Sequence, residues 1–167
     1  TNETFFKGVY RLDAGSSLLF KDGNITIDKY FKLDFKEENQ TFAEAVEKIA
    51  DVMKDSVNHH LISDVEVGSF LSSGIDSSYI VSLAKPNKTY TVGYDIEKYD
   101  EISYAKDLAE KLGITNKSHV ITKDEYMNSL SDIFYYLDEP TSDPAAISLY
   151  FVAKLASKDV KVVLSGE

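Results

Sequence analysis

The sequence contains no cysteine and only three prolines among its 167 residues. Without cysteine the chain forms no disulfide, no thiolate metal site and no catalytic thiol, and it suits a reducing compartment, so we expect a cytoplasmic location. The sequence has no apolar run of about 18 residues, the length that a transmembrane helix needs. It also lacks a basic segment followed by an apolar one at its start, so no signal peptide is visible and no membrane partner is expected.

Positive charge is scarce as well, since 18 basic residues face 28 acidic ones and the formal net charge is −10. A general nucleic-acid surface needs clustered lysine and arginine, so nucleic acid is not an expected partner. A nucleotide remains compatible with this charge, because one phosphate site depends on local N–H groups and a metal ion. The hydrophobic fraction of 43% is typical of a soluble globular protein.

The first 36 residues differ from the rest of the chain. Two strand-like runs, Ser17 to Lys21 and Ile25 to Phe31, flank Asp22-Gly23, a dipeptide that favours a tight hairpin turn. The sequence therefore predicts a β-hairpin over this region, which is marginal alone and must pack on something. Residues 36–40 are polar and indicate a linker to a second region, residues 41–167.

From residue 41 onward, helical and strand patterns alternate. Helices are expected over 41–60, 76–84, 101–112, 122–137 and 145–156, and strands over 66–71, 89–93, 115–121 and 160–164. Strands that alternate with crossover helices predict an α/β fold with a mostly parallel open sheet and helices on both faces. The helix over 145–156 is apolar nearly all round, so we expect it to be buried.

The segment from Leu71 to Ser78 joins a predicted strand to a predicted helix and carries the clearest chemical signal. Small residues let a backbone approach a ligand closely, and the start of a helix offers unpaired N–H groups and a positive dipole. Together with the serine hydroxyls they predict an anion site, most simply for phosphate. Asp76 fits such a site if a divalent cation bridges the carboxylate and the phosphate. The alternative is that Asp76 and the serines only cap the helix.

Several stretches of this sequence resemble a known family. The loop resembles the S-G-G-x-D-S pyrophosphate loop of N-type ATP pyrophosphatases, the PP-loop superfamily, although Ser73 replaces its first glycine. The chain is more closely similar to the synthetase domain of glutamine-hydrolysing asparagine synthetase. The similar stretches, in order, are Ser63 to Phe70, Tyr90 to Tyr94, Asp138-Glu139-Pro140 with Asp143-Pro144, and Val163 to Glu167.

The resemblance implies a role for particular residues. Main-chain atoms near Leu71 and Val92 would meet adenine, and Ser165 and Gly166 would line the nucleotide. The loop residues Ser72, Ser73, Gly74, Asp76 and Ser77 would hold pyrophosphate, with Asp76 also binding Mg²⁺, and Glu167 would act as the catalytic base toward ammonia. In open parallel sheets, ligands bind beyond the carboxyl ends of the strands, so these residues meet in one crevice if their strands are neighbours.

An acidic run, Asp95, Glu97, Asp100 and Glu101, follows the strand over 89–93. It is read as a solvated loop in which Asp100 caps the next helix, with contact to a metal or substrate at the mouth of the crevice as the alternative.

The implied activity is an ATP-dependent ligase that converts aspartate to asparagine through an aspartyl-adenylate, with AMP and pyrophosphate as products. ATP, Mg²⁺ and an amino acid are the implied cofactors and substrates, and a glutaminase domain of the same polypeptide would supply ammonia from glutamine. Residues 1–36 look like the last hairpin of that domain with its linker, and residues 41–167 like a partial synthetase domain. We therefore expect a truncated fragment that is inactive alone. A homodimer stays open.

Two other functions remain open at this point. One is a binding module that keeps the fold and docks a nucleotide without catalysis. The other is an adenylating amide or lactam synthetase that acts on a different substrate.

Overall fold

The structure is a computed structural model that describes residues 2–95, 101–138, 143 and 145–166. The chain divides into two compact units, residues 1–41 and residues 42–167. Each unit is described by itself below. Among the described residues, every helix is too short or too polar to cross a lipid bilayer.

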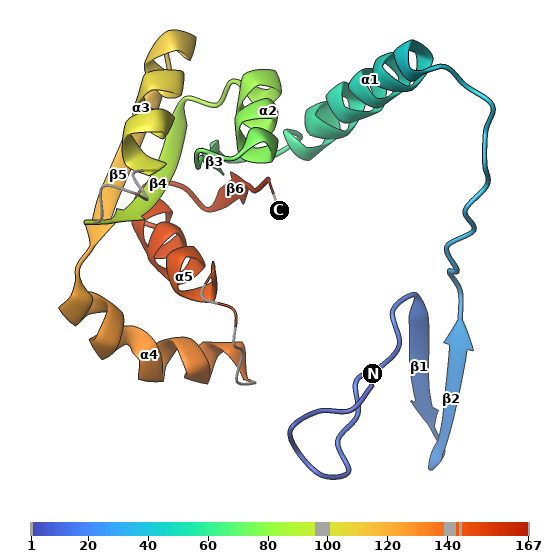
Figure 1. Cartoon of the computed structure of the whole chain (residues 1–167). Helices are drawn as coiled ribbons and strands as arrows, with labels where there is room; N and C mark the ends of the chain where they lie inside the picture. The colour runs from blue at the N-terminus through green and yellow to red at the C-terminus, as the bar shows by residue number, and fades with distance from the viewer. Residues whose placement is uncertain (1, 96–100, 139–142, 144, 167) are drawn as a thin grey trace. The chain divides into compact units, whose positions relative to one another are not determined.

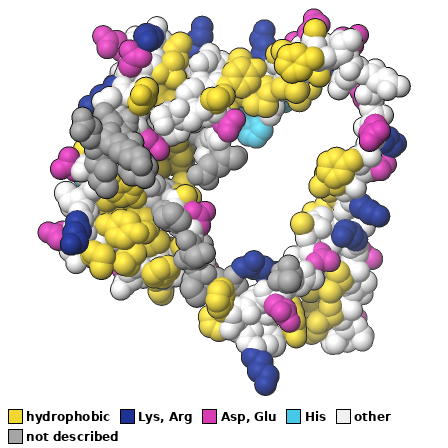
Figure 2. All heavy atoms as spheres, viewed as in Figure 1, with side chains coloured by type: hydrophobic (Ala, Val, Ile, Leu, Met, Phe, Trp, Pro, Cys, Tyr) yellow, Lys and Arg dark blue, Asp and Glu magenta, His cyan; other side chains and the backbone are white. Residues whose placement is uncertain are grey.

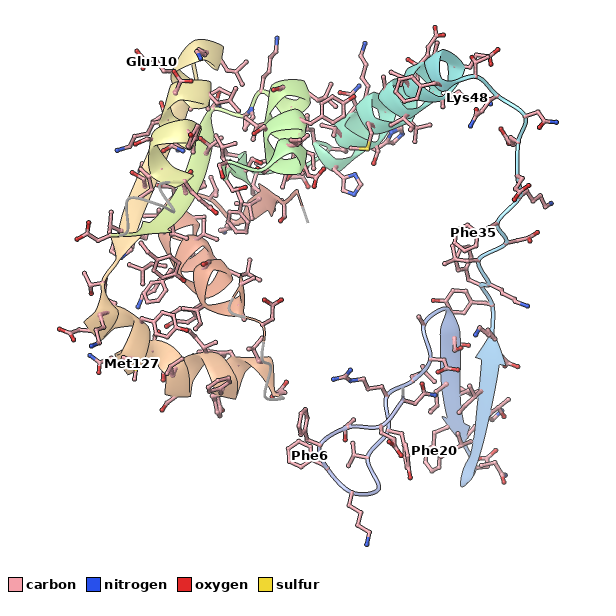
Figure 3. The ribbon with its side chains drawn as sticks, in the orientation of Figure 1. Phe6, Phe20, Phe35, Lys48, Glu110 and Met127 are labelled. Atoms are coloured by element: carbon pink, nitrogen blue, oxygen red, sulfur yellow. The ribbon has the colours of Figure 1, made fainter. Side chains whose placement is uncertain are left out.

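The first unit contains an antiparallel hairpin of β1 (Ser16–Lys21) and β2 (Asn24–Lys29). Asp22 and Gly23 form its turn with φ angles of 52° and 79°. Two positive φ values are the geometry of a type I′ turn, whose twist matches that of the paired strands, so the Asp-Gly signal is explained. Apolar side chains on the hairpin, including Phe20 (Figure 3), stay exposed within this unit.

The second unit is an α/β domain built on a four-stranded sheet (Figure 1). Its elements, in chain order, are α1 (Phe42–His60), β3 (Val67–Phe70), α2 (Ile75–Ala84), β4 (Lys88–Tyr94), α3 (Glu101–Leu112), β5 (Thr115–Ile121), α4 (Lys123–Leu137), α5 (Ala145–Ala156) and β6 (Val162–Leu164). The strand order is β5-β4-β3-β6, and every pair of neighbours is parallel. The predicted fold class is confirmed: a parallel sheet flanked by helices, preceded by a hairpin.

Helices cover both faces of this sheet, and each face has its own hydrophobic core. On one face, Val81 of α2 and Ala105 and Ala109 of α3 pack around Leu71. On the other face, α4 and α5 pack on the side chains of β4 that include Tyr90 and Val92. The alternation of side chains along β4 explains the two cores, because Thr89 and Thr91 point away from the face that Tyr90 and Val92 occupy.

Local signals end and begin the helices where the sequence predicts. Thr122 accepts a hydrogen bond from Glu125 N–H while the Glu125 side chain accepts from Thr122 N–H, so α4 starts with a complete capping box. Lys85 adopts the left-handed conformation after α2, one residue before Pro86 stops the helix. Gly113, with φ of 70°, ends α3 in the same way.

Two helices are less buried than their apolar sequences suggest. The helix α5 buries Ile147, Phe151, Val152 and Ala156, but Leu149 is 41% exposed, so the expectation of burial all round is only partly met. The helix α1 contacts α2 and buries Val57, whereas the apolar side chains of its first turns are exposed, as Figure 2 shows along its surface.

Candidate functional site

A cavity of about 430 Å³ opens at the carboxyl ends of β3 and β4 and beside the residues that follow β6. Its lining includes the predicted residues Leu71, Ser72, Ser77, Val92, Ser165 and Gly166. The strand order explains why these residues lie together, because β3 lies between β4 and β6 and the carboxyl ends of parallel strands lie at the same edge of the sheet. The volume lies within the range of small-molecule sites, roughly 300–1,000 Å³.

The serine loop is held by its own hydroxyl groups. The Ser77 hydroxyl accepts from Ser72 N–H at 3.2 Å, lies 2.9 Å from the Ser72 hydroxyl and donates to the Gly74 carbonyl at 3.2 Å. The Ser72 hydroxyl also accepts from Gly74 N–H at 3.1 Å. These bonds close the turn between Ser72 and Ser77, and they fix the loop before any ligand arrives.

The start of α2 carries no side-chain cap. Gly74 is the N-cap residue, and no side chain caps the helix there. The alternative in which Asp76 or a serine caps α2 is therefore not what the structure has. The first N–H groups of a helix without a cap carry partial positive charge, and they suit a phosphate.

Gly166 brings the segment after β6 against this helix start. A Cβ atom placed on Gly166 would lie 2.5 Å from Ser77 N and 2.6 Å from Ser77 Cα. Only a residue without a side chain permits this approach of one backbone to another. Gly166 thus forms a wall of the cavity and supports the loop at the same time.

Leu71 and Val92 present their main chains differently to the cavity. Leu71 N–H donates to the Tyr90 carbonyl at 2.9 Å, and the Leu71 carbonyl accepts from the Thr91 hydroxyl at 2.7 Å. Both polar groups of the Leu71 peptide therefore have partners in the protein. Val92 lies two residues beyond Tyr90, the partner of the last residue of β3, and there the cavity replaces the neighbouring strand.

Further residues line the cavity that sequence reasoning did not assign to the site. Tyr94 continues the face of β4 that holds Val92, and its hydroxyl lies 3.1 Å from the hydroxyl of Ser148 on α5. Side chains alternate between the two faces of a strand, so Tyr94, two residues after Val92, is expected on the same face. The sequence therefore held a signal for this residue. Glu101 at the start of α3 also lines the cavity, which fits the alternative reading of the acidic run.

Some predicted residues are placed elsewhere or not described. Ser73, Gly74 and Asp76 belong to the loop but do not line the cavity, and Asp76 is exposed. Glu167, Glu97 and Asp100 lie outside the described residues, as do Glu139-Pro140 and Pro144.

The metal donors at the loop are few. Within the described ranges, no group of three or more histidine or acidic side chains is arranged to hold a metal ion. Mg²⁺ commonly binds through one or two carboxylates together with substrate phosphates. Asp76 supplies one exposed carboxylate in the serine loop, and phosphate oxygens would have to complete that donor set.

Perturbed ionisation occurs mainly away from the cavity, near the amino ends of the strands. The hydrogen bond from Lys117 lowers the pKa of Asp159, and the hydrogen bond from Lys88 lowers the pKa of Glu66. Tyr90 contributes to the cavity wall, and burial raises the pKa of its phenol to about 12. The phenol therefore stays neutral near pH 7.

The fold and the site together define an α/β domain with an open parallel sheet and a cavity at the carboxyl ends of its strands, beside a serine loop and an uncapped helix start. A family model described as asparagine synthase matches residues 48–167. The chain belongs to the asparagine synthase family.

The relatives agree with this assignment. The chain is 49% identical to asparagine synthetase (glutamine-hydrolyzing) 1 of Bacillus subtilis over 164 residues, which cover 95% of this chain and 26% of that protein. It is 26% identical to asparagine synthetase B of Escherichia coli over 92% of this chain and 31% of that protein. The chain thus spans about a quarter to a third of the length of these curated relatives.

The fold also matches a solved structure. The U34-tRNA thiolase NcsA from Methanococcus maripaludis superposes with a TM-score of 0.50 at 23% identity, over 72% of this chain and 46% of that chain. This likeness concerns the fold alone.

Proposed function

We propose that this chain supplies the ATP site of a ligase that converts aspartate to asparagine. The observation that carries the proposal is the cavity in which Leu71, Ser72, Ser77, Val92 and Gly166 come together at the uncapped start of α2. A relative that is 49% identical and named a glutamine-hydrolysing asparagine synthetase supports the choice of reaction.

In this proposal the nucleotide lies across the strand ends. The adenine ring meets the main chain at Val92 and Leu71, Ser165 and Gly166 flank the nucleotide, and the loop from Ser72 to Ser77 binds the β- and γ-phosphates. Asp76 would hold Mg²⁺ together with phosphate oxygens, and the ion would neutralise part of the charge on the pyrophosphate. The first N–H groups of α2 are fixed before reaction, so they would stabilise the leaving pyrophosphate with little reorganisation.

The chemistry has two steps. A side-chain carboxylate oxygen of aspartate attacks the α-phosphorus of ATP, the bond to the bridging oxygen breaks, and pyrophosphate leaves with that electron pair. The product is an aspartyl-adenylate, a mixed anhydride with a better leaving group than the free carboxylate. Ammonia then attacks the activated carbonyl carbon and AMP leaves. We propose Glu167 as the base that accepts the proton from the attacking nitrogen.

The remainder of the proposal concerns the whole polypeptide. Ammonia would come from glutamine through a glutaminase domain in the same polypeptide, and residues 1–36 would be the last hairpin of that domain with its linker. The cytoplasmic location, the requirement for Mg²⁺ and a homodimer stay predictions.

The test is aspartate-dependent exchange of labelled pyrophosphate into ATP by the natural full-length protein. In the proposal the Ser77 hydroxyl, which donates to the Gly74 carbonyl in the structure, turns its proton to a phosphate oxygen when ATP binds. The Ser77→Ala variant loses that charge-assisted hydrogen bond, worth roughly 1.5–3 kcal/mol, so exchange should fall about ten- to a hundredfold. Ser78→Ala is the matched control, because the hydroxyls of Ser77 and Ser78 both donate to the Gly74 carbonyl, whereas only Ser77 lines the cavity.

The alternatives give different results. A protein that binds Mg-ATP but neither exchanges pyrophosphate nor forms AMP with any acid would be a binding module. Exchange that depends on another carboxylic acid would indicate an adenylating synthetase with a different acceptor. An unchanged rate in Ser77→Ala would remove Ser77 from the site.

A further inference from the structure

A chain of hydrogen bonds runs through the sheet from the edge strand β5 to the end of β3. The Asn116 side-chain amide donates to the hydroxyls of Thr89 and Thr91 at 3.1 and 3.0 Å, and the Thr91 hydroxyl donates to the Leu71 carbonyl at 2.7 Å. Thr89 is 0% exposed and Thr91 is 1% exposed. Bonds at this depth are not exchanged for water, so they hold one geometry.

The chemistry of the groups sets the direction of this chain. Thr91 has one hydroxyl proton, and a carbonyl only accepts, so that proton goes to Leu71 and Thr91 must accept from Asn116. Asn116 must therefore turn its amide nitrogen toward the threonines. Its Oδ1 atom is then buried without a hydrogen-bond partner among the described residues. A buried acceptor without a partner costs free energy, so the arrangement is held at a cost to stability.

The hydrogen bond from the Thr91 hydroxyl to the Leu71 carbonyl lies where the main-chain pairing of β3 and β4 ends. Leu71 N–H to the Tyr90 carbonyl is the last main-chain bond between these strands in the described chain. In a regular parallel pair the next bond would run from Val92 N–H to the Leu71 carbonyl. The Thr91 hydroxyl occupies that carbonyl instead.

The main-chain N–H and carbonyl groups of Val92 are therefore left facing the cavity. Main-chain polar groups alternate along a strand, so the N–H and carbonyl of Val92 point to the same side as those of Tyr90, toward β3. At Val92 the strand β3 has ended and the cavity begins. A donor and an acceptor side by side match the N1 acceptor and N6 amino donor of adenine.

We propose that Thr91, oriented by Asn116, is a positioning residue that keeps the Val92 main chain available to the purine ring. The inference rests on the proposed function, because it assumes an adenine nucleotide in this cavity. Thr91 itself does not line the cavity, so it acts through Leu71 and Val92. Asn116 and Thr91 thereby become determinants of nucleotide affinity outside the serine loop.

The experiment compares Thr91→Val with Thr89→Val. Both variants remove a buried hydroxyl from the same strand face and both cost Asn116 one hydrogen bond, but only Thr91 contacts Leu71. In Thr91→Val, Val92 N–H closes onto the freed carbonyl, so affinity for ATP and AMP falls about tenfold. Affinity for pyrophosphate stays within about twofold of wild type, since the loop donors are untouched. Thr89→Val binds all three ligands like wild type.

Two further measurements separate positioning from a general loss of structure. Hydrogen exchange of the Val92 amide should slow in Thr91→Val and stay unchanged in Thr89→Val, and this readout needs no ligand. Thr91→Ser restores the hydroxyl and should restore both nucleotide affinity and exchange. Should Thr91→Val not fold, Asn116→Ala replaces it, with weaker AMP binding at unchanged pyrophosphate binding as the expected result.

The result that would overturn the inference is equal nucleotide affinity and equal Val92 exchange in Thr91→Val and Thr89→Val. Wild-type protein that binds no ATP would contradict the proposed function instead. In that case, slower hydrogen exchange of the Val92 amide in Thr91→Val, but not in Thr89→Val, would still show that the Thr91 hydroxyl takes the place of the main-chain bond from Val92 to Leu71.

Discussion

The contact between Gly166 and the start of α2 gives the sharpest prediction. In Gly166→Ala the added Cβ atom would stand 2.5 Å from Ser77 N, 2.6 Å from Ser77 Cα and 2.9 Å from the Asp76 carbonyl carbon. All of these atoms belong to the backbone, so no side chain can rotate to make room. The segment after β6 and the first turn of α2 must separate.

The size of the effect follows from these distances. An ordinary contact begins at 3.4 Å, so the backbones must move apart by about 0.9 Å. Overpacking of this kind costs roughly 1–3 kcal/mol, which lowers the midpoint of thermal unfolding by about 3–10 °C for a domain of this size. A displacement of about 1 Å in a catalytic constellation costs on the order of a hundredfold in rate. Pyrophosphate exchange should therefore fall much further than stability alone would predict.

Gly68→Ala provides the matched control. Its Cβ atom would lie 2.8 Å from Cε2 of Tyr90, a residue that also contributes to the cavity wall, and 3.3 Å from the Val160 side chain, outside the serine loop. We expect a similar loss of thermal stability, with ATP affinity and exchange rate retained at a temperature where both variants are folded. The assay is thermal unfolding followed by ATP titration and pyrophosphate exchange below both midpoints. Wild-type exchange by folded Gly166→Ala would refute the idea that this glycine positions the loop.

Two predictions concern stability. Thr122→Ala removes the capping box of α4 and should lower the free energy of unfolding, measured in urea, by about 1 kcal/mol. Ser131→Ala, on the exposed face of α4, is the control and should change that free energy by less than about 0.5 kcal/mol. Equal losses in the two variants would contradict the role of the cap. Hydrogen bonds from Thr122, Lys117 and Lys88 hold the pKa values of Glu125, Asp159 and Glu66 below their ordinary values. A carboxylate whose pKa is lowered in the folded state adds stability at any pH above its ordinary pKa. The urea midpoint should therefore fall as the pH drops below 4.5, and it should continue to fall until the pH reaches the lowered pKa values of the folded state. Asp159→Asn should make the urea midpoint depend less steeply on pH in this acid range. An unchanged dependence would show that Asp159 does not contribute to it.

The order of elements in the second unit could be predicted because each element carries its own signal. Thr115–Ile121 has the predicted bounds as a strand, and α4 begins at the capping box formed by Thr122 and Glu125. Pro86 and Gly113 end the preceding helices for local steric reasons. The position of the candidate site was predictable for the same reason, since strand ends and a small-residue loop are visible in sequence.

What could not be predicted depends on pairing between distant segments. Nothing near Gly166 in sequence indicates that its backbone touches Ser77, because the contact arises only once β6 lies beside β3. Asn116 was invisible for the same reason, as its partners Thr89 and Thr91 are fixed by the register of β4 and β5. The uneven burial of α5 follows from the cavity, which leaves Leu149 at its wall rather than in the core.

The serine loop is held from several sides by groups that do not themselves have to bind a ligand. Thr91 holds the Leu71 peptide where the chain enters the loop, and Gly166 supports the helix start where the chain leaves it. Ser77 and Ser72 close the turn between them. In the proposed function, donors fixed in this way would lose little conformational entropy when an anion binds, so their alignment would favour catalysis as well as binding. A change at any one support should therefore weaken phosphate or purine recognition selectively, which a loop ordered only by its ligand would not show.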